Sequence, residues 1–551
     1  MSTASTPDGK TGTFPIFWPL SAFGAVLLSA GLLTVGLAAR PPMAVVETRL
    51  LSVAWEMWRD GSFLIPQLNG EAYLQKPPLL AWLIHLVWSV TGVSELAARL
   101  VAPAFGLLSI LLVAPLARLL WPERHAPALL APWILATTML FASLSSLTMY
   151  DAPLTAMTLL ALIFALRARG SEGILNWLLM GLALGAAFLF KGPAIVIHVA
   201  PLVLCLPFLA EGNRRPEWRR WYRGLLIAGA SGAAVALCWL VPATVAAGLP
   251  FLESFFWNLG AGRVVESIDH QAPFWFFAAL IPVFLWPWGW YLPVWPSLFR
   301  DRPWADEGLR FCLFWIASAF LIHSALSGKQ LHYLLPELPA LALVFARVWP
   351  WGTQASRYWR LLTALPVALS VFAGLIFATG WLPFEKADPF LPSFTNVAIA
   401  AGLTGLLFLL LALIRYSAIA LVLVAPVALV VVHLLAGDLL RSYGNQEIAR
   451  FIAQHEEAGI AYRGVEYHGE FTFTGRLTRP LEVFWHPQHM RQWAQRHPGA
   501  VIISKEGREG PGYDPVLESL FRGTTYRVWI VPEKQKKTGG DKAGGTKQQV
   551  Q

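Results

Sequence analysis

The chain has 551 residues, of which 56% are hydrophobic and only 14% are charged. Soluble domains carry about 25% charged residues, so this composition excludes a soluble globular protein and indicates an integral membrane protein. The formal net charge of +9 is typical of arginine-rich cytoplasmic loops in such proteins, and we expect no nucleic-acid partner.

Apolar segments begin with residues 14–39 and recur about thirteen times before residue 438. We expect helices, because lipid leaves open backbone hydrogen bonds unsatisfied. The first segment has no A-x-A-like cleavage site close behind it, so it predicts a retained helix. The prediction is an all-α polytopic membrane domain over residues 1–437.

Arginine-rich clusters fall in alternate loops between these segments. They lie at 167–170, 214–223, 300–303, 357–360 and Arg415. Because positively charged loops stay in the cytoplasm, we expect the N-terminus there and the other loops on the periplasmic side of a bacterial inner membrane. An odd number of spans then places the C-terminus outside.

The first external loop, residues 40–92, contains two helical patterns. ETRLLSVAWEMW, from Glu47, has apolar residues at helical spacing, and PPLLAWLIHLVWSV, from Pro77, begins with prolines suited to a helix N-terminus. Both stretches are short, so we expect interfacial helices that lie along the membrane.

The composition changes at residue 438. Residues 438–534 mix helical and alternating patterns, which predicts a small external α/β domain. Residues 535–551 are polar and glycine-rich, which predicts a disordered tail.

Ionisable side chains on the predicted outer side form the candidate site. They are Glu47, Arg49, Lys76, Asp151, Lys191, Arg263, Lys329 and His332, with Tyr333 next to the last. A charge within the hydrocarbon costs about 2.5–3.5 kcal/mol unless it finds a polar cavity or a partner. For any single residue the simpler interpretation is an interfacial side chain that reaches water. Together they predict an electropositive pocket with an embedded carboxylate.

Such a pocket suits transfer of a sugar from a lipid phosphate. Lys and Arg bind the phosphate and stabilise the charge that it gains as its bond to the sugar breaks. A carboxylate deprotonates or orients the attacking acceptor.

Four stretches carry a family resemblance: ETRLLSVAWEMWRDG, TMYDAPLTAMTLLAL, AFLFKGPAIV and GKQLHYLLPELPALAL. In this order, they resemble the bacterial aminoarabinose (lipid A) transferase and protein O-mannosyltransferase-like branch of the GT-C glycosyltransferases. The resemblance implies a GT-C fold, a periplasmic active site and a polyprenyl-phosphate sugar donor, typically undecaprenyl phosphate.

The resemblance also implies roles for single residues. Arg49, Lys76, Arg263 and Tyr333 would surround the donor phosphate and sugar, Lys191 would be a further cation, and Tyr73 completes this substrate-binding set. Asp151 would be the acid next to the reacting centre.

Two positions depart from the family's pattern. Val46 stands where the family has the first acid of an Asp-Glu pair, and Gln75 stands where it has Glu before the lysine. Three interpretations follow: Glu47 replaces the missing acid, Asp151 acts alone, or the chain binds donor lipid without turning it over. Gln75 also indicates a different sugar, since an acid there could recognise a cationic amino group.

No metal-site spacing links the histidines or cysteines. We expect no tightly bound cofactor, although a weakly held divalent ion at the lipid phosphate is compatible with the chemistry. His85, His198, His323 and His433 lie in apolar stretches and are interpreted as core histidines.

The sequence thus predicts a membrane glycosyltransferase that acts on an envelope acceptor such as lipid A, among membrane lipids. The sugar and the acceptor stay open. A catalytically degenerate lipid-binding homologue is the first alternative and a lipid or sugar transporter is the second; transporters show internal repeats and midplane polar groups, which this sequence does not suggest.

Overall fold

The computed structural model describes residues 21–257, 271–300, 304–350, 357–379 and 391–533. Within this part of the chain the protein divides into two compact units. The first comprises residues up to 444 together with 468–473, and the second comprises 445–467 and the residues from 474 onward. The predicted tail, 535–551, lies outside the described residues.

Eight spans in the described part of the chain are long and apolar enough to cross a membrane. Six are single helices: α1 (Ser21–Ala39), α4 (Glu95–Leu120), α7 (Asp151–Arg169), α10 (Trp218–Ala247), α16 (Glu307–Ala325) and α20 (Phe394–Leu413). Two combine consecutive helices: η5 (Leu331–Glu337) with α17 (Leu338–Val348), and α21 (Ser417–Val422) with α22 (Val424–Leu435).

A ninth span would consist of α18 (Arg357–Thr363) and α19 (Leu365–Ala378), which are bent by 47°. Three further apolar helices of the bundle are shorter: α5 (His125–Ala136), α8 (Leu175–Lys191) and α9 (Ala194–Leu209). The protein is therefore a multi-pass helical membrane protein, and the expected total of about thirteen spans stays a prediction.

Short elements connect these helices. They are α6 (Met139–Leu144), η2 (Gly212–Arg214), α11 (Leu249–Phe256), α13 (Phe276–Ala279), α14 (Ile281–Leu285), η4 (Trp288–Trp290), α15 (Val294–Arg300) and α23 (Gly437–Arg441).

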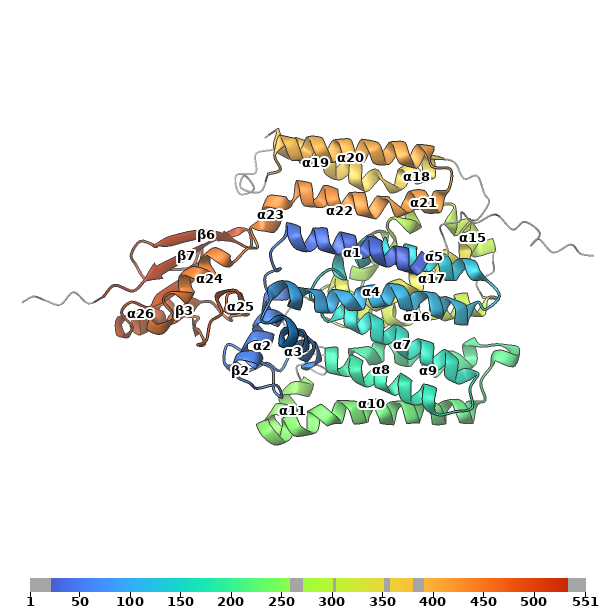
Figure 1. Ribbon diagram of the computed structural model, residues 1–551, viewed down its shortest axis with the longest axis horizontal. Coiled ribbons are helices and arrows are strands. Elements are labelled where there is room, and N and C mark those ends of the chain that lie inside the picture. Colours follow the sequence, from blue (N-terminus) through green and yellow to red (C-terminus); the bar gives the residue numbers. More distant parts are fainter. Residues whose placement is uncertain (1–20, 258–270, 301–303, 351–356, 380–390, 534–551) are drawn as a thin grey trace, which may run out of the picture. The chain divides into compact units, whose positions relative to one another are not determined.

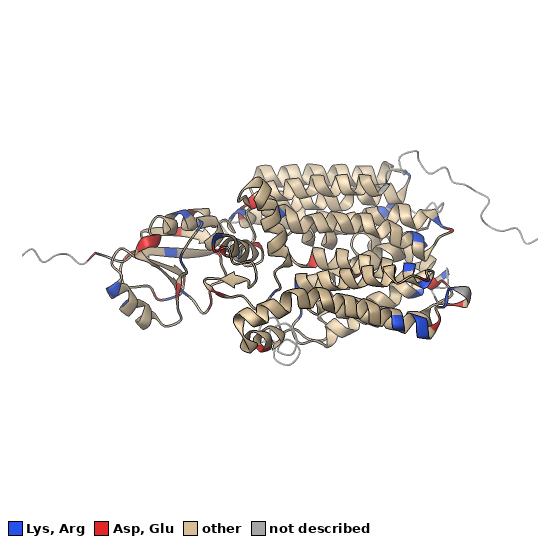
Figure 2. Cartoon of the chain, turned by 60° about the horizontal axis from the view of Figure 1, so that its bottom comes forward, with Lys and Arg blue, Asp and Glu red and all other residues tan. Residues whose placement is uncertain are grey.

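Charged residues at the helix ends fit the direction of each helix. α7 has Asp151 in its first turn and two arginines in its last, which complements the positive N-terminus and negative C-terminus of the helix dipole. Ser94 caps α4 by accepting a hydrogen bond from the Ala97 amide, and Asp306 caps α16 in the same way through the Leu309 amide. Lys and Arg gather at the end of the helical unit away from α2 and α3 (Figure 2).

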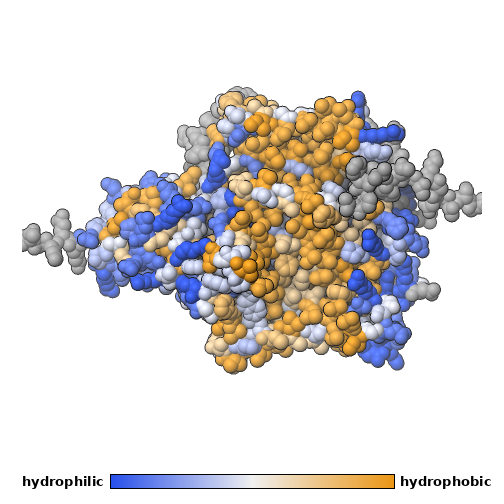
Figure 3. Space-filling view, viewed as in Figure 1, coloured by the Kyte–Doolittle hydropathy of each residue, from blue (hydrophilic) through white to orange (hydrophobic). Residues whose placement is uncertain are grey.

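Small residues let two helices of the first unit approach closely. A Cβ atom at Gly181 of α8 would lie 2.4 Å from the Ala228 carbonyl oxygen of α10, and one at Gly185 would lie 2.8 Å from the Gly232 carbonyl oxygen. Such contacts are a main source of helix association where lipid gives no hydrophobic driving force. Figure 1 shows α7, α8 and α10 running side by side, and Figure 3 shows hydrophobic side chains over much of the helical surface.

The first external loop forms both predicted helices, α2 (Glu47–Arg59) and α3 (Leu79–Thr91). Between them, β1 (Gln67–Leu68) and β2 (Glu71–Ala72) pair as a short antiparallel hairpin. The Glu56 carboxylate of α2 accepts hydrogen bonds from the turn amides of Asn69 and Gly70, at 2.8 and 2.9 Å. These bonds fix the hairpin to α2 and so set the course of the chain toward Lys76.

The second unit is an α/β domain. Its five-stranded sheet has the order β4-β3-β5-β7-β6, with β3 parallel to both β4 and β5, and β7 antiparallel to both β5 and β6. The strands are β3 (Ile460–Arg463), β4 (Glu482–Phe484), β5 (Val501–Lys505), β6 (Leu517–Phe521) and β7 (Thr524–Ile530), and the helices are α24 (Gln446–Ala453), η7 (Glu456–Ala458) and α26 (Pro487–Arg496). A short turn, α25 (Thr472–Gly475), follows β3.

Candidate active site

An ion pair between two helix ends forms the centre of the candidate site. Asp151 is the first residue of α7 and Lys191 is the last residue of α8, and Lys191 Nζ lies 2.5 Å from Asp151 Oδ1. Because consecutive helices joined by a short loop run antiparallel, these two ends lie at the same level of the bundle. The side chains are only 3% and 9% exposed, so these two ionisable residues at the ends of apolar helices are each other's partner.

The η5 segment covers this pair from the other side. Tyr333 presents its ring to Lys191, with Nζ 5.2 Å from the ring centroid. The neighbouring His332 has Nε2 3.9 Å from Asp151 Oδ2. Asp151, Lys191 and Tyr333, which lie far apart in sequence, are thus brought together, and their role in substrate binding stays a prediction.

The first external loop brings further cations. Lys76 Nζ lies 5.9 Å from the centroid of the Tyr150 ring, and Tyr150 directly precedes Asp151. Arg49 donates a hydrogen bond to the Gln75 side-chain oxygen at 3.1 Å. Tyr73 is half-buried on the same loop, and its backbone amide donates to the Pro66 carbonyl at 2.7 Å.

The structure does not show two other predicted cations, Lys329 and Arg263, in contact with the ion pair. Lys329 Nζ donates to the backbone carbonyls of Ala272 and Leu326, and its side chain is buried. It therefore ties two loop segments together. Arg263 lies outside the described residues, so its predicted contact with the donor stays a prediction.

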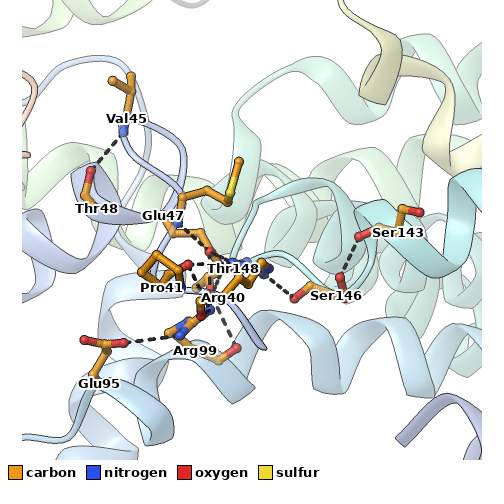
Figure 4. Close-up of polar contacts among 11 residues, drawn as sticks. Arg40, Pro41, Val45, Glu47, Thr48, Glu95, Arg99, Ser143, Ser146 and Thr148 are labelled. Carbon is orange, nitrogen blue, oxygen red and sulfur yellow. Dashed lines mark hydrogen bonds and ion pairs between the residues drawn. The ribbon is translucent and has the colours of Figure 1, made fainter. Parts of the chain in front are cut away.

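Glu47, the second candidate acid, lies in a saturated network (Figure 4). Its carboxylate accepts from the Met43 amide, the Thr148 amide and the Thr148 hydroxyl, each at 2.9 Å. It also forms an ion pair with Arg40, and Arg99 lies 3.8 Å away. Complete burial raises the pKa of Glu47, but the two guanidinium groups outweigh burial and hold the pKa below its ordinary value.

The Glu47 network fixes the chain that leads into Asp151. Arg40 donates to the Ser146 carbonyl at 3.3 Å while Glu47 holds both polar groups of Thr148, three residues before Asp151 (Figure 4). Among the described residues, Arg40, Met43 and Thr148 fill the acceptor capacity of Glu47, so its geometry is that of an anchor, whereas Asp151 has one short contact, to Lys191. Of the three interpretations of the missing acid, this geometry favours Asp151 acting alone.

A buried acid that the sequence analysis did not single out lies on η5, the segment that carries Tyr333. Glu337, at the end of η5, has Oε1 2.6 Å from His198 Nδ1 of α9. The available signal was a glutamate within the apolar stretch LLPELPALAL, where an ionisable group requires a partner. His198 is therefore a paired histidine of the core.

Among the described side chains, no group of three or more His, Cys, Asp or Glu residues could hold a metal ion. The expected weak divalent ion at the lipid phosphate stays a prediction.

A cavity of about 230 Å³ lies next to the Glu47 network. Arg40, Met43 and Ser146 line it together with residues of α1, α4, α6, α22 and α23.

The chain is similar to several known proteins. The profile of the family described as "Dolichyl-phosphate-mannose-protein mannosyltransferase" matches residues 75–245. An undecaprenyl phosphate-alpha-4-amino-4-deoxy-L-arabinose arabinosyl transferase from Pectobacterium atrosepticum is 30% identical over 343 residues, 60% of this chain and 59% of that protein. The protein of the same name from Pseudomonas paraeruginosa is 30% identical over 62% of this chain and 63% of its own length.

The chain therefore matches about three fifths of the length of these curated relatives. Among solved structures, ArnT from Cupriavidus metallidurans bound to undecaprenyl phosphate has a TM-score of 0.73 at 19% identity, covering 92% of this chain and 97% of that chain. An archaeal oligosaccharyltransferase from Archaeoglobus fulgidus has a TM-score of 0.54 at 14% identity, covering 90% and 70%. The likeness establishes a GT-C type of fold and confirms the resemblance to aminoarabinose transferases.

Proposed function

We propose that this protein is a membrane glycosyltransferase that moves a sugar from undecaprenyl phosphate to an acceptor of the cell envelope such as lipid A. The observation that carries this proposal is the buried Asp151–Lys191 pair at the ends of α7 and α8, with Tyr333 over the lysine. Its support from outside the chain is the similarity to transferases whose names specify an undecaprenyl-phosphate-linked sugar.

The chemistry follows from the charges. An oxygen of the acceptor attacks the anomeric carbon of the donor, the bond between that carbon and the phosphate oxygen breaks, and the lipid phosphate leaves with the electron pair. Arg49 and Lys76, together with Arg263, stabilise the negative charge that grows on the phosphate. Asp151 accepts the proton of the acceptor, and Lys191 orients the Asp151 carboxylate.

We also propose where the reaction occurs. The arginine clusters at one end of the helical unit support a cytoplasmic location for that end in the bacterial inner membrane (Figure 2). The candidate site and the C-terminal α/β domain then face the periplasm. No tightly bound cofactor takes part, and any divalent ion is held weakly by the lipid phosphate.

Gln75 bears on the choice of sugar. Its side chain accepts a hydrogen bond from Arg49, so it keeps the geometry of an Arg–carboxylate contact without the negative charge. A neutral amide does not attract a cationic amino group on the donor. The donor sugar is therefore proposed to lack such a group.

A degenerate donor-binding homologue is the second candidate. Val46 and Gln75 favour it, since both replace acids expected from the resemblance while the phosphate-binding cations Arg49 and Lys76 are present. Such a protein would bind undecaprenyl phosphate and transfer no sugar.

One assay tests both candidates. Purified protein in proteoliposomes is incubated with radiolabelled undecaprenyl-phosphate sugars, one cationic and one neutral, and with envelope lipids. The variants are Asp151→Asn and Lys76→Ala, with Asp438→Asn as the matched control, since Asp438 is exposed and pairs with Arg441 at the end of a short helix.

We expect the parent and the control to transfer the neutral sugar, Asp151→Asn to bind undecaprenyl phosphate without transfer, and Lys76→Ala to bind it less tightly. Donor binding without transfer by the parent would establish the degenerate homologue. If the parent neither binds nor consumes any donor, both candidates are wrong.

A further inference from the structure

A histidine and a glutamate form a buried pair deep in the helical unit. His198 Nδ1 of α9 lies 2.6 Å from Glu337 Oε1, and the two side chains are 2% and 5% exposed. The other carboxylate oxygen, Oε2, is buried and has no hydrogen-bond partner among the described residues. Burying an ionisable acid in such surroundings costs free energy, so the presence of Glu337 close to the candidate site requires an explanation.

Aromatic rings connect this pair to the site. The ring of His198 stacks on that of His323 of α16, with centroids 5.2 Å apart, and His323 in turn contacts the Tyr333 ring at 5.9 Å. Tyr333 then covers Lys191, whose Nζ is 5.2 Å from the ring centroid. A continuous column of side chains therefore runs from Glu337 to the Asp151–Lys191 pair.

The backbone that carries Tyr333 has little rigidity of its own. η5 is a 3₁₀ segment with non-helical dihedral angles at Leu334, and Pro336 within it has no amide hydrogen to donate. Short 3₁₀ segments have poorer hydrogen-bond geometry than α-helices. Side-chain contacts must therefore hold the orientation of Tyr333.

His198 supplies these contacts at both ends of η5. It binds Glu337, the last residue of the segment, directly, and it supports Tyr333, near the start of the segment, through the ring of His323. His323 is itself fixed, because its Nδ1 lies 2.8 Å from the carbonyl oxygen of Ala319 one turn earlier.

We infer that the His198–Glu337 pair is a buried brace that positions Tyr333 and, through Tyr333, the Lys191–Asp151 pair for sugar transfer. The inference rests on the proposed function for its catalytic consequence. Neither residue reaches the reacting atoms, so both are positioning residues. Small displacements far from the chemistry cost about 10²-fold in rate, which sets the scale of the expected effect.

Three substitutions separate the parts of the brace. His198→Phe keeps a ring for stacking and removes the donor, Glu337→Leu removes the acceptor, and Glu337→Gln keeps an acceptor oxygen for His198. The matched control is His433→Phe in α22, because His433 Nδ1 also bonds a carbonyl one turn earlier, that of Leu429, at 2.7 Å. Each variant is scored only on the fraction that elutes as folded protein.

Two readouts are combined. The first is kcat for sugar transfer in proteoliposomes. The second is the ¹⁹F NMR shift of 3-fluorotyrosine incorporated at position 333, which reports the surroundings of that ring whether or not sugar is transferred.

We expect His198→Phe and Glu337→Leu each to lower kcat about 10²-fold and to move the ¹⁹F signal. The double variant is expected to be no worse than either single one, because both substitutions remove the same contact. Glu337→Gln is expected to keep most of the parental kcat, and His433→Phe is expected to match the parent in both readouts.

Parental kcat and a parental ¹⁹F shift in the folded fraction of His198→Phe and Glu337→Leu would overturn the brace, leaving the pair a purely structural contact. If the ¹⁹F signal moves but the parent itself transfers no sugar, the positioning of Tyr333 stands and the proposed function fails. Should Glu337→Leu yield no folded protein, His198→Phe and Glu337→Gln test the brace: a lower kcat and a moved ¹⁹F signal in the first but not the second would support it, and parental values in both would overturn it.

Discussion

Glu47 and Asp151 are both buried carboxylates of the same helical unit, yet their surroundings differ in kind. Glu47 is surrounded by two arginines, two backbone amides and a hydroxyl. Among the residues that the structure describes, Asp151 has one short contact, to Lys191, and a longer approach from His332. A carboxylate whose acceptor capacity is used within the protein holds the fold, while one with spare capacity can meet a substrate.

The largest effect should come from Asp151→Asn. The substitution keeps the shape of the side chain and removes its ability to accept a proton, so we expect sugar transfer to fall by about 10²–10⁴-fold. Undecaprenyl phosphate binding should change little, because the cations remain. Parental transfer by this variant would remove Asp151 from the chemistry and reopen the role of Glu47.

Glu47→Gln should act on stability first. Loss of the carboxylate removes the anion that pairs with the buried Arg40 and leaves Arg99 with Glu95, and breaking such a buried pair costs about 3–5 kcal/mol. Glu95→Gln is the control, since Glu95 pairs with the same Arg99 but is 34% exposed and contributes about 0.3–0.5 kcal/mol. Thermal denaturation in detergent measures both, and equal midpoints would contradict the anchoring role.

Thr148→Val tests whether the Glu47 network reaches Asp151. The variant loses the hydroxyl bond to Glu47, so we expect a loss of about 1 kcal/mol in stability together with a lower kcat. Thr158→Val is the matched control, because the Thr158 hydroxyl is equally buried but bonds only to the Leu154 carbonyl of its own helix. A rate loss that is the same in both variants would show that the two regions are not coupled.

The smallest expected effect is a difference in acid unfolding between Glu47→Gln and the parent. The folded-state pKa of Glu47 lies below its ordinary value of 4.5, so its stabilising contribution is fully present above about pH 4.5. That contribution is lost as the pH falls through the lower, folded-state pKa. Acid unfolding followed by circular dichroism should therefore show a shallower limb for Glu47→Gln than for the parent, and parallel limbs would contradict the assignment.

Composition and the recurring apolar segments predicted a multi-pass helical membrane protein, and the mixed helical and alternating patterns after residue 438 predicted a small C-terminal α/β unit. Local chemistry predicted both helices of the first external loop, because apolar spacing and paired prolines act over a few residues. The count of about thirteen spans is harder to test by length, since α5, α8 and α9 are each shorter than a typical crossing.

The candidate site was predictable as a set of residues but not as a set of contacts. The free-energy cost of a charge near lipid indicated Asp151 and Lys191 as candidate site residues, and the tertiary structure shows that they pair with each other. The hydrogen bond from the Thr148 hydroxyl to Glu47 joins residues 101 positions apart, and the His198–Glu337 contact joins residues 139 positions apart. Such distances exceed any local pattern, so only the tertiary structure separates an anchoring acid from an available one.

The glycines between α8 and α10 bear on the candidate site as well as on packing. Gly181 and Gly185 let α8 lie close to α10, and Lys191 ends the same helix. A side chain at either glycine would push α8 away from α10 about two to three turns before the lysine. Residues with no chemistry of their own thereby help to place the lysine that pairs with Asp151.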